Sequence, residues 1–323
     1  PASPEVFDLT QPDGSTFPAR LWGDEWFNGL ETIDGYPILE QEDGWWVYAE
    51  LSKDKKAFQP ALARDDSALV VGISSPAGLK TNVRPIRDVA EQEGMGSLNN
   101  QNFGTQPILA LFVSFSDRSE TYPVSTYSGI FFGNGKSVQD YYSHASDYQF
   151  TMTPAAENFS TSNDGMIGWI NLGYPHPNPG RNTDERNQKI VRDALLAADE
   201  FVDFSQFDRN YDDYISSQEL HLVIMVAGYE ASASGSSSPS IWAHRWSLFG
   251  TYSAPLLDGV IVGSSAGGGG YTQLGEIFRD HPATMGTLAH ELGHDISWPD
   301  LYDINQLSEG VGEWSLMGSG NWN

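Results

Sequence analysis

The string HELGHDISWPD, residues 290–300, constrains this chain more than any other stretch. Residues four apart lie on one face of a helix, so His290 and His294 would present both imidazoles to a single point. A metal ion there would lie about 2 Å from each ring nitrogen. Gly293 lets the helix end early, and the chain can then return Asp300 to the same point as an oxygen ligand. The fold must therefore gather a helix and its following turn around a cation.

Glu291, between the two histidines, supplies a candidate reactive group. It is offset by about 100° around the helix, so its carboxylate would project beside the metal and take a proton from water. The alternative is a helix that carries two histidines by chance. The chain has only 7 histidines, and WSLMGSG places Met317 in a small-residue turn of the kind that underlies such metals. We therefore favour the metal site.

Composition limits the ligands and the partners. The chain has no cysteine, so any metal must sit on His, Asp or Glu. With 17 Lys and Arg against 43 Asp and Glu, the net charge is -26, and such a surface repels nucleic acid and anionic lipid. No apolar run approaches the ~20 residues that cross a bilayer, so we expect no membrane span. The acidity favours either solubility or clusters that hold cations.

The segment DRNYDDYISSQE, residues 208–219, matches the twelve-residue calcium loop of EF-hands. The predicted ligands are Asp208, Asn210, Asp212, Tyr214 through its carbonyl, and Glu219, with Ser216 at the ninth position. Asp213 stands at the sixth position, where glycine is usual. The sequence therefore predicts a structural Ca²⁺ site, and the alternative is an acidic solvent loop.

The residues around the histidines also resemble a known family. HELGHDISWPDLYD, followed by GEWSLMGSG, resembles the metzincin zinc peptidases and specifically the secreted bacterial metalloproteases of the immune inhibitor A family. That family has Asp as third ligand, followed by a Leu-Tyr-Asp run, here Leu301, Tyr302 and Asp303. The resemblance continues upstream through SVQDYY and IWAHRW. In one departure, Ser297 stands where the family has a glycine at a sharp turn with φ > 0.

The resemblance implies a secreted, extracellular zinc endopeptidase that hydrolyses proteins or peptides and is made as a zymogen. Zn²⁺ would be held by His290, His294 and Asp300, with Glu291 as general base. The first third of the chain resembles the family's propeptide, which would act as inhibitor. Family members continue past the methionine turn, so the catalytic domain is expected to be C-terminally incomplete. A non-catalytic calcium- and zinc-stabilised binding or adhesion module is the alternative.

The expected fold is α/β (α+β), a metzincin-like catalytic domain with a twisted mixed sheet and packed helices, preceded by a smaller, mostly β propeptide domain. Its predicted parts are a propeptide domain at 1–73, a linker with the activation cleavage at 74–105 and the catalytic domain at 106–323. Asp34-Gly35 and Asp43-Gly44 predict hairpin turns. Helices are expected at 24–30, from 137 and at 182–204, and strands at 107–117, 220–228 and 240–246.

A latch is expected in the N-terminal third. ARLWGDEW resembles the Phe-x-Gly-Asp segment that blocks zinc in some metzincin propeptides, with Leu21 in place of Phe and Asp24 in the blocking position. The alternative is that Asp24 merely caps the short helix expected at 24–30.

Overall fold

A computed structural model of the chain describes residues 1–86, 102–233, 235, 237–304, 308 and 310–322. Residues 87–101, which make up 15 of the 32 residues of the predicted cleavable linker at 74–105, lie outside the described residues. No helix in the described part of the chain is long and apolar enough to cross a membrane.

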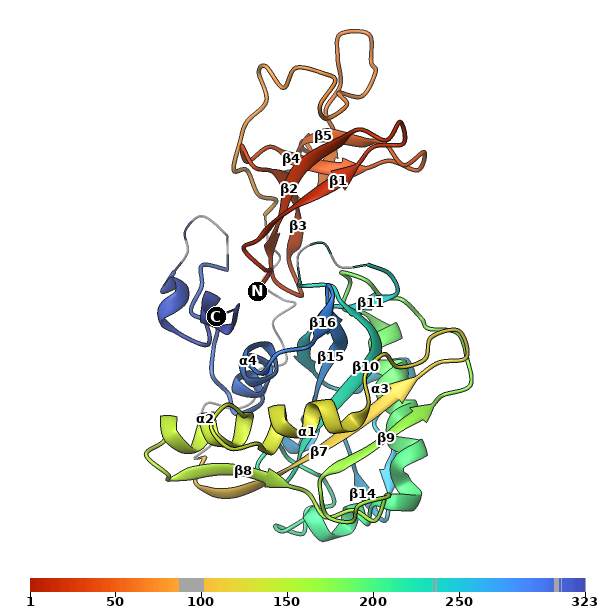
Figure 1. Ribbon diagram of the computed structural model, residues 1–323, viewed down its shortest axis with the longest axis vertical. Coiled ribbons are helices and arrows are strands. Elements are labelled where there is room, and N and C mark those ends of the chain that lie inside the picture. The colour runs from red at the N-terminus through yellow and green to blue at the C-terminus, as the bar shows by residue number, and fades with distance from the viewer. Residues whose placement is uncertain (87–101, 234, 236, 305–307, 309, 323) are drawn as a thin grey trace.

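The first part of the chain folds into an antiparallel meander, shown in red and orange in Figure 1. Its six strands pair in sequence order: β1 (Val6–Thr10), β2 (Thr16–Gly23), β3 (Asn28–Thr32), β4 (Pro37–Glu40), β5 (Trp46–Leu51) and β6 (Phe58–Pro60). Gly35 and Gly44 take φ of 83° and 82° in the connections before and after β4, because the two tight turns require a left-handed residue. Both predicted hairpin turns are therefore present.

The helix expected at 24–30 is wrong. Residues 24–27 form the turn between β2 and β3, and β3 begins at Asn28. The Asp24 carboxylate accepts hydrogen bonds from the amides of Trp26 and Phe27 (2.9 and 2.8 Å), and this local bonding competes with a helix.

The rest of the chain forms a mixed sheet with helices on both faces. Its main order is β12-β15-β10-β7-β8, with β9 beside β7, β11 beside β10 and β16 beside β15. The strands are β7 (Gly104–Ser114), β8 (Phe150–Pro154), β9 (Met166–Asn171), β10 (His221–Glu230), β11 (Ser240–Ile241), β12 (His244–Trp246), β15 (Tyr271–Phe278) and β16 (His281–Pro282), with a separate pair of β13 (Leu256–Leu257) and β14 (Val260–Ile261). β12 and β16 run antiparallel to β15, whereas the central pairs are parallel.

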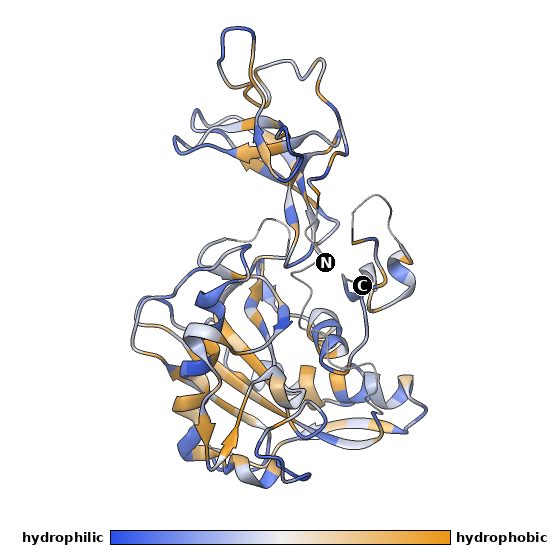
Figure 2. Ribbon diagram, turned by 180° about the vertical axis from the view of Figure 1, so that it is seen from behind, coloured by the Kyte–Doolittle hydropathy of each residue, from blue (hydrophilic) through white to orange (hydrophobic). Residues whose placement is uncertain are grey.

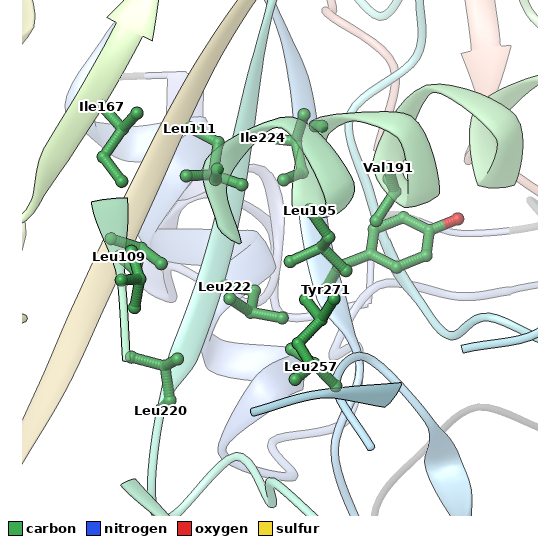
Figure 3. Close-up of a cluster of buried hydrophobic side chains, with 14 of the residues drawn as sticks. Leu109, Leu111, Ile167, Val191, Leu195, Leu220, Leu222, Ile224, Leu257 and Tyr271 are labelled. Atoms are coloured by element: carbon green, nitrogen blue, oxygen red, sulfur yellow. The ribbon is translucent and has the colours of Figure 1, made fainter. Parts of the chain in front are cut away.

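The helices divide between the two faces of this sheet. They are α1 (Val124–Phe132), α2 (Val138–Ala145), α3 (Glu185–Ala198) and α4 (Met285–Asp295), and short 3₁₀ turns lie at Asp199–Phe201, Phe204–Phe207, Gly250–Tyr252, Ser265–Gly267, Gly312–Trp314 and Ser319–Trp322. Alternate residues of a strand point to opposite faces. On one face, Leu109 and Leu111 of β7 pack with Val191 and Leu195 of α3 (Figure 3). On the other, Ile108 and its alternate neighbours pack with α1, α2 and α4.

The two sheets have their own apolar interiors, visible as orange strands in Figure 2. They also meet. The core of the smaller sheet includes Ala231 and Trp242 from the larger domain, and Trp242 is only 1 % exposed. The turn between β2 and β3 points toward the larger domain (Figure 1), which brings residues 24–27 to the helix that carries the histidines.

Candidate metal centre and active site

Helix α4 carries both histidines and the glutamate in the interior of the protein. His290 is 0 % exposed, Glu291 2 % and His294 8 %. The helix ends in a Schellman motif, because the amide of Ser297 donates to the His294 carbonyl (2.9 Å) and that of Trp298 to the Gly293 carbonyl (2.8 Å). The motif needs a left-handed residue directly after the cap, and Ser297 takes φ of 72° there. Ser297 therefore adopts the left-handed conformation that the family's glycine would take at this position.

The reversal of the chain brings Asp300 back to the two histidines. Its Oδ1 lies 3.4 Å from Nε2 of His290 and 3.2 Å from Nε2 of His294. His290, His294 and Asp300 form a group whose nearest ligand atoms all lie within 4.8 Å of one another. The structure therefore brings together the three residues predicted to hold a metal.

The outer nitrogens of both rings are fixed by backbone carbonyls. Nδ1 of His290 lies 2.8 Å from the Leu316 carbonyl, and Nδ1 of His294 lies 2.9 Å from the Trp298 carbonyl. A carbonyl only accepts, so Nδ1 carries the proton in each ring and Nε2 of the neutral ring presents a lone pair. Both Nε2 atoms and Asp300 Oδ1 are buried without a hydrogen-bond partner of normal geometry. Three buried acceptors that converge in this way fit a cation.

The charges around His294 favour the same conclusion. Burial alone would lower its pKa, but the carboxylates of Asp300, Glu291 and Glu25 raise that pKa to about 10. The pKa of His290 is instead lowered to about 4, chiefly by burial. A proton on His294 thus offsets part of a strongly negative site in the metal-free protein. Two imidazoles and a carboxylate are the ligand set of many zinc centres, so the residues present fit Zn²⁺.

Met317 packs directly beneath this helix. A Cβ placed on Gly293 would lie 2.5 Å from Met317 Sδ, so any larger residue there would force the methionine side chain to shift. The Met317 carbonyl accepts from the amide of Leu301 (2.7 Å), next to Asp300 in the chain. The methionine turn therefore braces the helix and the returning chain, while its neighbour Leu316 orients the ring of His290.

Glu291 lies beside the histidines with an unsatisfied oxygen. Its Oε2 is buried without a hydrogen-bond partner, and burial raises the pKa of its carboxyl. A carboxylate with a raised pKa, beside a cation site, is suited to accept and return a proton. Tyr302, whose buried hydroxyl also lacks a partner, lies near Asp300, and burial raises its pKa as well.

The acid from the N-terminal domain that reaches this centre is Glu25. Glu25, Glu291 and His294 form a second group within 4.8 Å, and all three are buried. Burial, and then the carboxylate of Glu291, raise the pKa of Glu25 well above its usual range. The predicted blocking residue Asp24 lies in the turn, where its Oδ1 accepts the two amides of residues 26 and 27. The tandem acids in GDEW were the only sequence signal that could have pointed to Glu25.

Residues 208–219 form a self-bonded loop. Asp208 accepts from the amides of Asp212 and Asp213 (3.2 and 3.1 Å), Glu219 accepts from the amide of Ser216 (3.0 Å), and Asp213 takes φ of 65° at the sixth position. Within the described residues, the loop's acids do not converge within 4.8 Å as the two groups at α4 do. Asn210, Asp212 and Tyr214 lie in the same loop, linked by side-chain-to-amide bonds.

Comparisons with known proteins agree with this geometry. A family model described as "Immune inhibitor A peptidase M6, catalytic domain" matches residues 106–323. The pre-pro-metalloprotease PrtV of Vibrio cholerae is 28% identical over 257 residues, which are 68% of this chain and 27% of that protein. Immune inhibitor A of Bacillus thuringiensis subsp. alesti is 32% identical over 148 residues, 41% of this chain and 21% of its own length. The matched regions thus span about a quarter of the length of these curated relatives.

Proposed function

The chain belongs to the immune inhibitor A peptidase M6 family of metallopeptidases, and from that premise we propose that it is a secreted zinc endopeptidase that its own N-terminal domain holds inactive. One observation carries the proposal: Nε2 of His290, Nε2 of His294 and Oδ1 of Asp300 converge in the interior with no hydrogen-bond partner. Zn²⁺ bound by these atoms would polarise the scissile carbonyl and make water acidic enough to react near neutral pH.

Glu291 performs the proton transfer. Its carboxylate takes a proton from the attacking water as the water oxygen bonds to the carbonyl carbon. It then returns that proton to the amine that leaves when the C–N bond breaks. Burial keeps bulk water from competing for this proton, and the raised pKa brings the carboxyl closer to the pKa that suits catalysis at neutral pH.

The turn between β2 and β3 is the proposed latch. It is anchored on the larger domain, because Thr183 Oγ1 donates to the Glu25 carbonyl (3.0 Å) and Asn28 Nδ2 donates to the Arg181 carbonyl (3.1 Å). The Glu25 side chain then occupies the space beside Glu291 and His294 that a substrate needs. We therefore place the latch in the segment predicted from sequence, with Glu25 entering the site and Asp24 shaping the turn. The word "pre-pro" in the name of the Vibrio relative is in keeping with a precursor form.

The proposed organisation keeps the division into a propeptide domain (1–73), a cleavable linker (74–105) and a catalytic domain (106–323). The loop at 208–219 is proposed to bind Ca²⁺ through Asp208, Asn210, Asp212, Tyr214 and Glu219. It pairs with β14 through Ile215 and Ile261 (3.0 Å), so a bound ion would brace this region in a chain without disulfides. Protein or peptide substrates follow from the endopeptidase proposal.

The decisive experiment separates metal binding from hydrolysis. The zinc-loaded chain, before and after limited proteolysis in the 74–105 segment, is assayed for casein hydrolysis with and without a chelator, and its zinc content is measured. The Glu291→Gln variant should keep zinc and lose activity by about 10³-fold or more, since the general base is gone. Glu200→Gln, at an exposed acid, is the matched control and should leave both unchanged. Near-normal activity of Glu291→Gln would refute the mechanism, and an inert wild type that binds zinc would indicate a binding module instead.

A further inference from the structure

An open cavity of about 850 Å³ lies beside the latch, between the two domains. The smaller domain contributes its residues 25–28. The larger domain contributes residues 181–184 together with Trp246, Ser247, Phe249 and Ser265. Glu25 both lines this cavity and groups with Glu291 and His294 within 4.8 Å, so this one residue links the cavity to the proposed catalytic centre.

One wall of the cavity is aromatic. The rings of Trp246 and Phe249 meet edge to face, with centroids 5.1 Å apart and planes at 84°. Phe249 is 50 % exposed although it belongs to the larger domain's own fold. Trp246 ends β12, the outermost strand of the main sheet order in the described part of the chain. A peptide that adds to the open edge of a strand places alternate side chains in neighbouring pockets, here against the aromatic wall.

Trp26 of the latch already rests on this wall. Its ring lies 5.3 Å from that of Trp246, with the planes at 75°. The next residue toward the N-terminus is Glu25, whose carboxylate lies within 4.8 Å of ligand atoms of His294 and Glu291. Adjacent residues of the latch thus contact the aromatic wall and the proposed catalytic centre. Trp26 places an indole against this wall, whereas the carboxyl group of Glu25 lies beside Glu291 and His294.

We propose that Trp246 and Phe249 form a specificity subsite for an aromatic side chain of the substrate, close to the scissile bond, and that Trp26 occupies this subsite in the latent protein. The inference rests on the proposed peptidase function and adds the substrate preference. A ring entering the subsite replaces the contact that Trp26 makes with Trp246. Edge-to-face packing and loss of water from both rings favour it over a methyl group.

The preference is measured on the zinc-loaded chain after linker cleavage. Two fluorogenic peptide series differ only in Trp, Phe or Ala, placed at each of the two positions on either side of the scissile bond. At one position, kcat/KM for Trp or Phe should exceed that for Ala by about tenfold or more. Trp246→Leu and, independently, the milder Phe249→Ala should reduce this ratio to about threefold or less. Leu256→Ala, at an apolar residue that is 68 % exposed and does not line the cavity, should keep it. A wild-type ratio near one, or a ratio that both subsite variants retain, overturns the proposal.

A binding experiment decides the same question without catalysis. In the uncleaved Trp26→Ala chain the subsite is vacated, so N-acetyl-tryptophanamide should bind in ligand-observed NMR, whereas N-acetyl-alaninamide should not. The signal should be lost in the Trp26→Ala/Trp246→Leu chain. If N-acetyl-tryptophanamide binds but the cleaved chain does not hydrolyse casein, the subsite is supported and the peptidase function is refuted. If the cleaved chain hydrolyses casein but shows neither an aromatic preference nor binding of the indole, the peptidase function is supported and the subsite is refuted.

Discussion

Replacing Ser297 by glycine should stabilise the protein, although serine is the native residue. Ser297 takes φ of 72° at the left-handed position of the Schellman motif that ends α4. A Cβ in that conformation costs about 1–2 kcal/mol. Glycine relieves this strain but gives up about 0.4–1 kcal/mol because its unfolded chain is freer. The difference between the midpoints of these two ranges is a net gain of about 0.8 kcal/mol in the free energy of unfolding.

The measurement compares Ser297→Gly with Ser297→Ala, since alanine keeps the Cβ and removes the hydroxyl along with any bond it makes. Unfolding in urea, with a calorimetric Tm, should rank the glycine variant above the alanine variant by about 1–3 °C for a domain of this size. The same pair at Ser128, inside α1, should give the opposite order by about 1 kcal/mol. If Ser297→Gly is no more stable than Ser297→Ala, the left-handed strain does not exist and the turn is built differently.

Three further predictions test other contacts. In Gly293→Ala the new Cβ would meet Met317 Sδ at 2.5 Å, so about 1–3 kcal/mol of overpacking outweighs a helix-propensity gain of about 1 kcal/mol, and zinc affinity falls in a metal titration. Adding Met317→Ala should restore much of that affinity, and failure to do so would contradict the clash. Burial lowers the pKa of His244 to about 4, so the folded protein binds fewer protons than the unfolded chain below pH ~6.5. The free energy of unfolding, measured by urea titration, should therefore fall by up to about 3 kcal/mol between pH 6.5 and 4. In His244→Asn it should fall less steeply with pH. An identical pH dependence in the two proteins would show that His244 does not cause the loss of stability. Glu25→Ala in the uncleaved chain should raise casein hydrolysis at least about tenfold, which corresponds to a loss of about 1.4 kcal/mol from the free energy that holds the turn in the site. Glu42→Ala, at an exposed acid, is the control and should leave the activity unchanged. Equal activities of the two variants would show that Glu25 is not part of the latch.

The convergence of the three predicted metal ligands could be foreseen from sequence because their geometry is local. His290 and His294 share a helix face by periodicity alone, and six residues suffice to bring Asp300 back. The left-handed backbone at Ser297 was also foreseeable, because a helix that reverses this sharply needs such a residue. The hairpins around β4 followed from their Asp-Gly pairs in the same way. Each of these features depends on neighbours within about a dozen residues.

Features that depend on distant contacts were not readable. The helix expected at 24–30 failed because apolar residues at helical spacing also fit two strands joined by a turn, and Asp24 closes that turn. The sequence could not show that Glu25, and not Asp24, groups with Glu291 and His294, because this depends on how the β2–β3 turn packs on Arg181 and Thr183. The sheet order is likewise set by long-range pairing, with β15 inserted between β10 and β12.

The contacts that fix α4 differ from those between the β2–β3 turn and the larger domain. Asp295, the last residue of α4, accepts from Ser217 Oγ (2.6 Å), His221 Nδ1 (2.6 Å) and Arg245 Nε (3.0 Å), all buried. Burial alone would raise its pKa, but the hydrogen bond from His221 and the charge of Arg245 hold it well below the usual range.

Removing one partner of such a network costs several kcal/mol, so α4 is fixed to β10, β12 and the end of the 208–219 loop by groups that belong to the larger domain alone. The β2–β3 turn instead contacts that domain through hydrogen bonds at Thr183 and Arg181 and through the packing of Trp26 on Trp246. Withdrawing the turn breaks none of the bonds that orient His290, His294 or Asp300. On the proposed zymogen mechanism, departure of Glu25 and Trp26 would therefore expose a group of predicted metal ligands that is already assembled.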